Sequence, residues 1–152
     1  MVGARARLHA VGMNGAPYRV RVLLAEDSPV VARQLRALLA QEFEVLGLVT
    51  DGDAILGALD ALQPDVLVTD ISLPGLDGMQ AAELALRRLP RLRVVFITVH
   101  DEPALVAKAK SLPRTAYVLK ADAGDALNAA VEEVMAGRWY ASASLDRHAT
   151  RR

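Results

Sequence analysis

Short runs of Val, Ile and Leu recur along this 152-residue chain, and several of them end on reactive side chains. These residues are three acids, a hydroxyl and an amine: Glu26, Asp27, Asp70, Thr98 and Lys120. Carboxylates that lie close together repel one another, so a cluster of three requires a cation. A hard divalent ion fits, and Mg²⁺ usually binds through one or two carboxylates together with a phosphate.

This set of side chains predicts phosphoryl transfer to a carboxylate. A carboxylate can attack phosphorus in line and form an aspartyl phosphate. A metal ion and Lys120 would neutralise charge on the transferred group, and Thr98 would donate a hydrogen bond to one of its oxygens. A buried acid cluster without a cation would be costly, which favours a functional explanation over a purely structural one.

The elements that must position these residues alternate between two hydrophobic periods. Near-continuous apolar character is typical of strands buried on both faces, and it occurs at residues 20–25, 45–49, 66–69, 94–98 and 116–119. Segments with helical spacing lie between these runs. The alternation predicts a β-α unit repeated five times, which gives a five-stranded parallel sheet with helices on both faces. Ligands bind outside the carboxyl ends of such strands, where the reactive residues would converge.

Local signals mark the helix starts. Ser28 followed by a proline predicts an N-cap and a first helical turn. Asp51 and Asp122 are predicted to cap the second and the last helix. Asp77 precedes a glycine, and we expect it to serve as a turn and cap residue before a helix at about residues 79–89.

Composition limits the class of protein. A hydrophobic fraction of 53% indicates a globular chain, and 18 basic against 18 acidic residues give no sign of nucleic-acid binding. No cysteine is present, which excludes disulfides and suits a cytoplasmic protein. No apolar run reaches the roughly 18 residues that a membrane helix needs. We expect a disordered leader at residues 1–18, one domain at 19–140 and a short tail at 141–152.

Five motifs in order resemble bacterial two-component response regulator receiver domains. Residues 24–28 resemble the acidic pair of the first strand. Asp70 begins the sequence Asp-Ile-Ser-Leu-Pro-Gly-Leu-Asp-Gly, which is similar to the family's phosphoacceptor signature Asp-x-x-x-Pro-x-x-Asp-Gly. Residues 97–98 match the switch hydroxyl, and residues 117–120 match the strand with the switch aromatic and the lysine. The resemblance covers residues 19–140 and implies the flavodoxin-like (βα)5 receiver fold.

The resemblance also implies a site and a cofactor. Asp70 would be the phosphoacceptor. Mg²⁺ would be bound directly by Asp27, Asp70 and the backbone carbonyl of Ser72, and through water by Glu26. The protein would act as a signalling switch and not as an enzyme.

The resemblance further implies a switch and its partners. Phosphorylation by a sensor histidine kinase would draw Thr98 toward the phosphoryl group, and Tyr117 would then turn inward. Lys120 would bind the phosphoryl group. The altered face would contact an unknown downstream protein, and family analogy together with the apolar last helix indicates a homodimer as well. No DNA binding by this chain and no membrane contact are expected.

Sequence details indicate a subtype and some departures. Residues 120–122 and 136–140 resemble receivers of the NarL/FixJ type, which precede a helix-turn-helix DNA-binding domain. The chain is therefore either a single-domain regulator or the receiver fragment of a transcriptional regulator. Residues 112–114 replace the usual Gly-Ala before the fifth strand, and Val99 stands where the family has a smaller residue. Ser72 and His100 occupy positions that tune phosphoryl lifetime in the family.

The same residues disfavour three other functions. A haloacid-dehalogenase-type phosphatase needs a second acid where Ser72 stands. A flavodoxin needs a phosphate-binding loop where the acids Glu26 and Asp27 would repel phosphate, and no G-x-G-x-x-G is present for a dinucleotide. A constitutive interaction module with a vestigial site does not account for the intact acids and Lys120.

Overall fold

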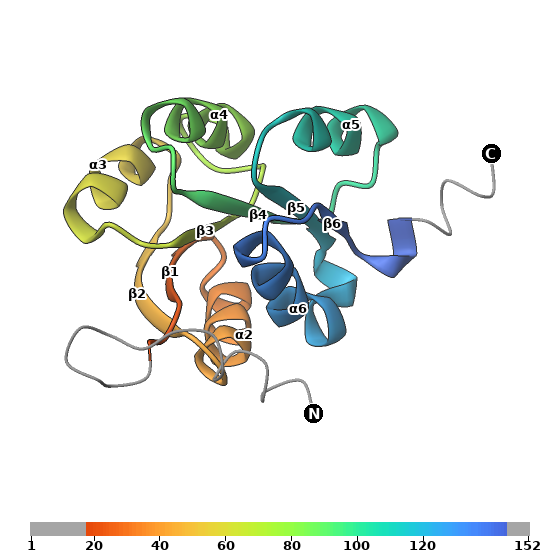
Figure 1. The fold of residues 1–152 in the computed structure, drawn as a ribbon, viewed down its shortest axis with the longest axis horizontal. Coiled ribbons are helices and arrows are strands. Elements are labelled where there is room, and N and C mark those ends of the chain that lie inside the picture. The colour runs from red at the N-terminus through yellow and green to blue at the C-terminus, as the bar shows by residue number, and fades with distance from the viewer. Residues whose placement is uncertain (1–17, 146–152) are drawn as a thin grey trace.

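A computed structural model describes residues 18–145, so nearly all of the predicted leader lies outside the described part. Within that part a parallel sheet of six strands has the order β2-β1-β3-β4-β5-β6 (Figure 1). The strands are β1 (Arg21–Ala25), β2 (Glu44–Val49), β3 (Val66–Thr69), β4 (Arg93–Thr98), β5 (Thr115–Leu119) and β6 (Tyr140–Ala141). The chain reverses its direction of sheet growth between β1 and β3, which creates the crevice where ligands of such sheets bind.

The flavodoxin-like parallel fold is confirmed, but the predicted number of strands was one too low for residues 18–145. The additional strand, β6, pairs in parallel with the edge of β5. It has only two residues, Tyr140 and Ala141, and no apolar run marks it. Its pairing with β5 depends on how the chain folds back after α6, and hydrophobic periodicity does not predict such a contact.

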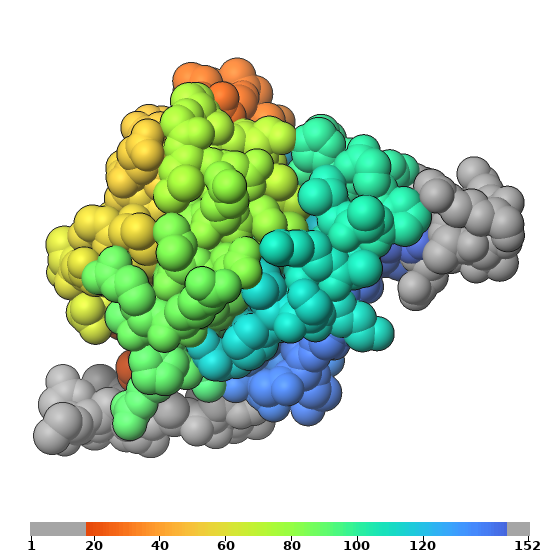
Figure 2. Space-filling model, turned by 90° about the horizontal axis from the view of Figure 1, so that it is seen from above, coloured from red at the N-terminus to blue at the C-terminus, as the bar shows by residue number. Residues whose placement is uncertain are grey.

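Helices cover both faces of the sheet (Figure 1). The first face carries α2 (Pro29–Ala40) and α6 (Ala123–Met135), and the second carries α3 (Asp53–Leu62), α4 (Gly78–Arg88) and α5 (Pro103–Ser111). Figure 2 shows the second face, with α4 and α5 side by side. None of the helices within residues 18–145 is long and apolar enough to span a membrane.

Two core layers follow from the alternation of side chains along each strand. Leu23 of β1 and Phe96 of β4 pack under the second face, whereas Leu24 and Ile97, the next residue in each strand, pack under the first. All four side chains are fully buried. Strands that are apolar on both sides are therefore held rigidly, and their carboxyl ends stand at one edge.

Of the caps predicted for Ser28, Asp51 and Asp122, the first two side chains accept a hydrogen bond from the first turn of their helix. The Ser28 hydroxyl accepts a hydrogen bond from the amide of Val31 at 3.3 Å. Asp51 lies one residue before the N-cap position of α3, which Gly52 occupies, and its Oδ1 accepts a hydrogen bond from the amide of Ala54 at 2.9 Å. The prediction for Asp122 was wrong: it stands at the N-cap position of α6, yet its carboxylate accepts hydrogen bonds from Ser144 and none from the first turn of α6 among the described residues.

The unusual loop before β5 has a structural explanation. Arg114 has a φ of 60°, a left-handed conformation that normally favours glycine. Its guanidinium donates hydrogen bonds to the carbonyls of Leu86 at 2.9 Å and Leu92 at 2.8 Å. These bonds satisfy carbonyls at the C-terminal end of α4 and after it, and they offset the strain of the left-handed backbone.

Candidate functional site

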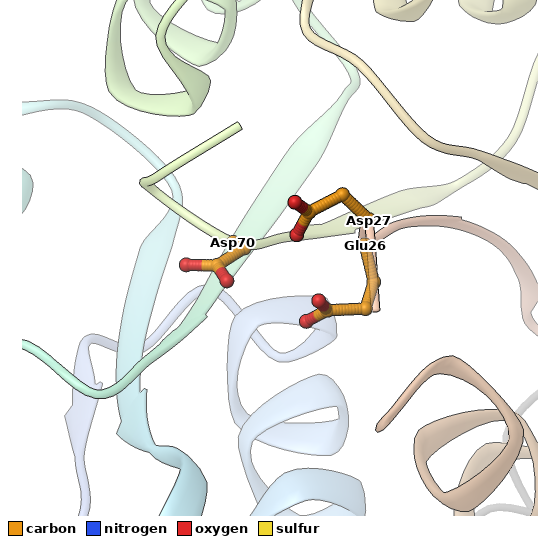
Figure 3. Close-up of side chains that lie close together, drawn as sticks. All are labelled: Glu26, Asp27 and Asp70. Carbon is orange, nitrogen blue, oxygen red and sulfur yellow. The ribbon is translucent and has the colours of Figure 1, made fainter. Parts of the chain in front are cut away.

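Three carboxylates meet at the carboxyl ends of β1 and β3. Glu26 and Asp27 follow β1, and Asp70 follows β3. The two strands are hydrogen-bonded neighbours whose last residues are in register, so the acids stand at the same level. One oxygen from each carboxylate lies within 4.8 Å of the others (Figure 3). Glu26 and Asp70 are buried, whereas Asp27 is exposed.

Lys120 neutralises part of this negative charge. Its Nζ lies 2.7 Å from Asp70 Oδ2 and 2.8 Å from Glu26 Oε1. Burial lowers the pKa of Lys120, but the hydrogen bonds to Asp70 and Glu26 and their negative charges outweigh burial and hold the pKa above its usual value. The amine is therefore a fixed positive charge beside the Asp70 carboxylate.

Backbone amides hold the two buried carboxylates in place. The amide of Ser28 donates to Glu26 Oε2 at 3.0 Å. The amide of Ser72 donates to Asp70 Oδ1 at 3.2 Å. Each buried acid thus has one oxygen on a backbone amide and the other next to the Lys120 amine, as a hydrogen bond for Asp70 and as an ion pair for Glu26, whose Oε1 has no hydrogen-bond partner among the described residues.

The three acids can hold a divalent metal ion. Their oxygens form a compact cluster, and Lys120 supplies one positive charge against three negative ones. Asp27 has no ion pair among the described residues. Carboxylate oxygens around an uncompensated negative charge suit a hard cation.

Thr98 and Tyr117 meet at the backbone of His100. The buried Thr98 Oγ1 accepts a hydrogen bond from the His100 amide at 3.2 Å, so its own proton is available to a further acceptor. The Tyr117 hydroxyl donates to the His100 carbonyl at 2.8 Å. The Tyr117 side chain is fully buried in this structure, whereas an inward position was predicted only for the phosphorylated state.

Contacts between polar side chains join the loop after β3 to the loop after β4. Ser72 Oγ lies 2.7 Å from His100 Nε2, and His100 Nδ1 lies 3.5 Å from a carboxylate oxygen of Glu102. Ser72 and His100 were each predicted to lie beside the site, but neither their contact with each other nor the ion pair of His100 with Glu102 was predicted. Ser72 lies two residues after Asp70, and His100 lies two residues after Thr98. These spacings are the only feature of the sequence that could have indicated the pairing. Val99, which stands where the family has a smaller residue, is 69% exposed and takes no part in these polar contacts.

Asp77 and Gly78 shape the loop that follows Asp70. Asp77 caps α4, since its Oδ1 accepts from the amides of Met79 at 2.7 Å and Gln80 at 3.3 Å. The Gly78 amide donates to the carbonyl of Ile71 at 2.8 Å. The expected turn and cap role of Asp77 is confirmed, and the glycine lets the start of α4 approach the site backbone closely.

Substituting Gly78→Ala should destabilise the protein by about 2 kcal/mol, because overpacking of a dense site forces backbone shifts. A Cβ at this position would lie 1.9 Å from the Asp70 carbonyl oxygen. Urea unfolding at pH 7 measures the loss. Gly57→Ala is the matched control, because a Cβ there meets nothing within 4 Å and the helix should be as stable or more stable. Equal midpoints for Gly78→Ala and wild type would contradict the close approach.

Alkaline pH should destabilise the wild type more steeply than Tyr117→Phe. Burial raises the pKa of the Tyr117 phenol far above its ordinary value, and the charges of Glu102, Asp101 and Asp70 raise it further. Because the folded pKa is raised, this stabilisation is complete below about pH 10 and is lost as pH rises toward the folded pKa. Urea midpoints between pH 8 and pH 11 measure the slope, and parallel slopes for the two proteins would refute the assignment.

Comparison with known proteins identifies the domain. The sequence profile of the response regulator receiver domain matches residues 22–132. The chain is 36% identical over 135 residues to the transcriptional regulatory protein NarL of Mycobacterium tuberculosis, covering 87% of this chain and 62% of that protein. It is 27% identical to the transcriptional regulatory protein DegU of Brevibacillus brevis, covering 80% of this chain and 52% of that protein. The chain thus spans only about half to three fifths of these relatives.

Solved structures of receiver domains are similar to this chain as well. The isolated receiver domain of RcsB from Salmonella enterica serovar Typhimurium, in the presence of the phosphomimetic BeF3⁻, superposes with a TM-score of 0.77 at 28% identity, covering 86% of this chain and 98% of that one. The signal receiver domain of NarL from M. tuberculosis superposes with a TM-score of 0.65 at 31% identity, covering 76% and 98%. This chain belongs to the family of response regulator receiver domains and resembles the NarL and RcsB members.

Proposed function

We propose that this receiver domain takes a phosphoryl group on Asp70 from a sensor histidine kinase and passes on the signal through changed protein contacts. The observation that carries the proposal is the contact of the Lys120 amine with Asp70 inside an acid cluster at the strand ends. A structural role alone does not account for three clustered acids held by a single lysine. This chain lacks the residues that a flavodoxin or a haloacid-dehalogenase-type phosphatase would need.

Four residues are proposed to hold Mg²⁺. Asp27, Asp70 and the backbone carbonyl of Ser72 would bind it directly, and Glu26 would bind it through water. When bound, Mg²⁺ supplies positive charge for the transferring phosphoryl group. The cluster fits this role because Asp27, with no ion pair among the described residues, stands exposed beside two fixed carboxylates.

The remaining residues act on the phosphoryl group. Asp70 Oδ would attack phosphorus in line while the bond to the histidine nitrogen of the kinase breaks. Lys120 would exchange its contact with the carboxylate for one with a phosphoryl oxygen. Thr98, whose hydroxyl proton is available, would donate to another. Tyr117 would hold the His100 backbone that is bonded to Thr98, and so fix the loop after β4.

The partners and the extent of the domain follow from the same proposal. A histidine kinase would supply the phosphoryl group in the cytoplasm, and residues 19–140 would form the receiver unit. RcsB, a structural relative, is known as dimers bound to DNA. We propose a homodimer or an unidentified downstream protein for this chain, with DNA contact left to an effector domain if the chain is the receiver part of a regulator.

Labelling by acetyl phosphate tests the proposal. The protein should gain the mass of one phosphoryl group when Mg²⁺ is present and none when EDTA is added. Borohydride reduces an aspartyl phosphate to homoserine and releases phosphate, so peptide mapping after reduction should find homoserine in place of Asp70. An adduct on another residue, or equal labelling with EDTA, would refute the assignment. Continuous turnover of a phosphate ester would instead favour the phosphatase alternative.

A further inference from the structure

The loop between β3 and α4 is supported from outside by the start of α3. The tip of this loop, residues 72–76, belongs to no helix or strand. Among residues 18–145 the tip makes a single backbone–backbone hydrogen bond, in which the Gly52 amide donates to the Pro74 carbonyl at 2.9 Å. Ser72, whose carbonyl is proposed to bind Mg²⁺, lies in the same tip. The placement of a proposed metal ligand therefore depends on a residue outside its own loop.

The α-carbon of Gly52 also lies against the tip. A Cβ at this position would stand 1.5 Å from the Leu76 carbonyl oxygen, where no real Cβ fits. The φ of Gly52 is −69°, which is open to every residue, so the glycine is needed for space and not for its backbone conformation. The next residue of α3 repeats the approach, because a Cβ on Gly75 would lie 2.1 Å from Asp53 Oδ2. The start of α3 and the tip are thus in close contact, with no room for a side chain on Gly52.

This support matters because the tip is otherwise open to water. Ser72, Pro74 and Gly75 are all exposed, and segments with few buried contacts open locally at low free-energy cost. The Ser72 amide donates to Asp70 Oδ1 at 3.2 Å, so a displaced tip would also disturb the Asp70 carboxylate. Mg²⁺ demands a nearly ideal octahedral arrangement of its oxygen ligands. Displacement of the tip should therefore weaken Mg²⁺ binding.

We propose that Gly52 is a positioning residue of the phosphorylation site. Its amide holds the Pro74 carbonyl, and its bare α-carbon lets the backbone at Leu76 lie against α3, so that the tip keeps the Ser72 carbonyl in place as a Mg²⁺ ligand. Gly52 itself would contact neither the metal ion nor the phosphoryl group. Partners that hold metal ligands in place commonly control metal affinity in this way. This inference rests on the proposed function of Asp70 and its Mg²⁺ site.

Gly52→Ala should weaken Mg²⁺ binding about tenfold, the loss expected when the partner of a metal ligand is disturbed. A bound ion stabilises the folded state according to its concentration and Kd, so urea midpoints over a range of Mg²⁺ concentrations give the Kd without any phosphodonor. The rate of labelling by acetyl phosphate should reach half its maximum at an equally raised Mg²⁺ concentration, with the maximal rate unchanged. A loss of folded protein alone would instead lower the maximal rate.

The matched control is the same substitution farther along the same helix. A Cβ on Gly57 meets nothing within 4 Å, so Gly57→Ala leaves the contact between α3 and the tip untouched. This variant should bind Mg²⁺ with the Kd of the wild type and reach half-maximal labelling at the same Mg²⁺ concentration. A folded Gly52→Ala protein with the wild-type Kd would overturn the proposal.

A second measurement uses the wild type and so does not depend on whether Gly52→Ala folds. Coupling between two interactions is reciprocal: if the bond from Gly52 to Pro74 favours Mg²⁺ binding, Mg²⁺ must strengthen that bond by the same factor. Hydrogen exchange of the Gly52 amide, followed by NMR, should therefore slow about tenfold at saturating Mg²⁺. The Gln63 amide, which donates to the Leu59 carbonyl at the other end of α3, should exchange at an unchanged rate.

The outcomes separate the two proposals. A wild type that binds Mg²⁺ and takes up a phosphoryl group, but whose Gly52 amide exchanges at the same rate with and without Mg²⁺, overturns the positioning role and leaves the phosphoacceptor assignment intact. A wild type whose urea midpoint does not respond to Mg²⁺ and that takes up no phosphoryl group overturns both.

Discussion

Asp70→Asn should abolish labelling by acetyl phosphate in the presence of Mg²⁺. The amide has nearly the shape of the carboxylate, so it can keep the hydrogen bond from the Ser72 amide. It lacks the anionic oxygen that attacks phosphorus, and it removes one charge from the cluster of acids. The expected result is a folded protein whose intact mass does not change on incubation with the donor.

The control for this variant is an aspartate outside the site. Asp60→Asn removes a carboxylate that pairs with Arg88 on the surface, with both side chains about half exposed. Its labelling should equal that of the wild type, and circular dichroism should show that both variants are folded. Labelling of Asp70→Asn at the wild-type rate would refute the role of Asp70, because another residue would then carry the phosphoryl group.

Lys120→Met should destabilise the metal-free protein by about 3 kcal/mol, since removing one partner of a buried ion pair leaves the other charge unpaired. The charge left behind is mainly that of Glu26, whose side chain is fully buried and bonded to the lysine at 2.8 Å. Methionine has similar length and keeps the apolar contacts of the stem. Urea unfolding at pH 7 in EDTA measures the loss, with Lys110→Met, an exposed lysine of α5, as the matched control.

The pH and Mg²⁺ dependence of this variant provide a second check. Because the pKa of Lys120 is raised in the folded protein, its stabilisation is complete below about pH 10 and disappears as pH rises through the folded value. The difference between wild type and Lys120→Met should therefore shrink at strongly alkaline pH. It should also shrink when Mg²⁺ is added, because a bound cation offsets the same carboxylates. A difference that stays constant under both changes would contradict the electrostatic explanation.

The sequence was sufficient to predict the acid cluster because two kinds of information agree there. Apolar runs buried on both faces indicate parallel strands, and parallel strands end at one edge of the sheet. Glu26, Asp27 and Asp70 stand directly at those ends, so their proximity depends on little more than which strands are neighbours. Hydrophobic pattern does not say which strands are neighbours. The motif that begins at Asp70 did so indirectly, because it resembles receiver domains, in which the order of the strands is known.

The contacts around His100 required the folded chain. Its amide, carbonyl and ring contact Thr98, Tyr117 and Ser72, which lie on three different segments. No periodicity relates residues so far apart, and the direction of each side chain depends on the packing of the loop after β4. The inward position of Tyr117 is likewise a result of tertiary packing.

By itself, then, the sequence determined the alternating parallel fold, the starts of α2 and α3, and the group of charged residues at the strand ends, because each depends on local pattern. Only the tertiary structure decided the sixth strand and the partner of Asp122. Strand β6 has two residues, which are too few to show a hydrophobic period. The sequence places Asp122 next to a helix start, but its hydrogen-bond partner is Ser144, 22 residues away. Which partner Asp122 binds depends on where the chain after α6 returns to the sheet, and local propensity does not specify this path.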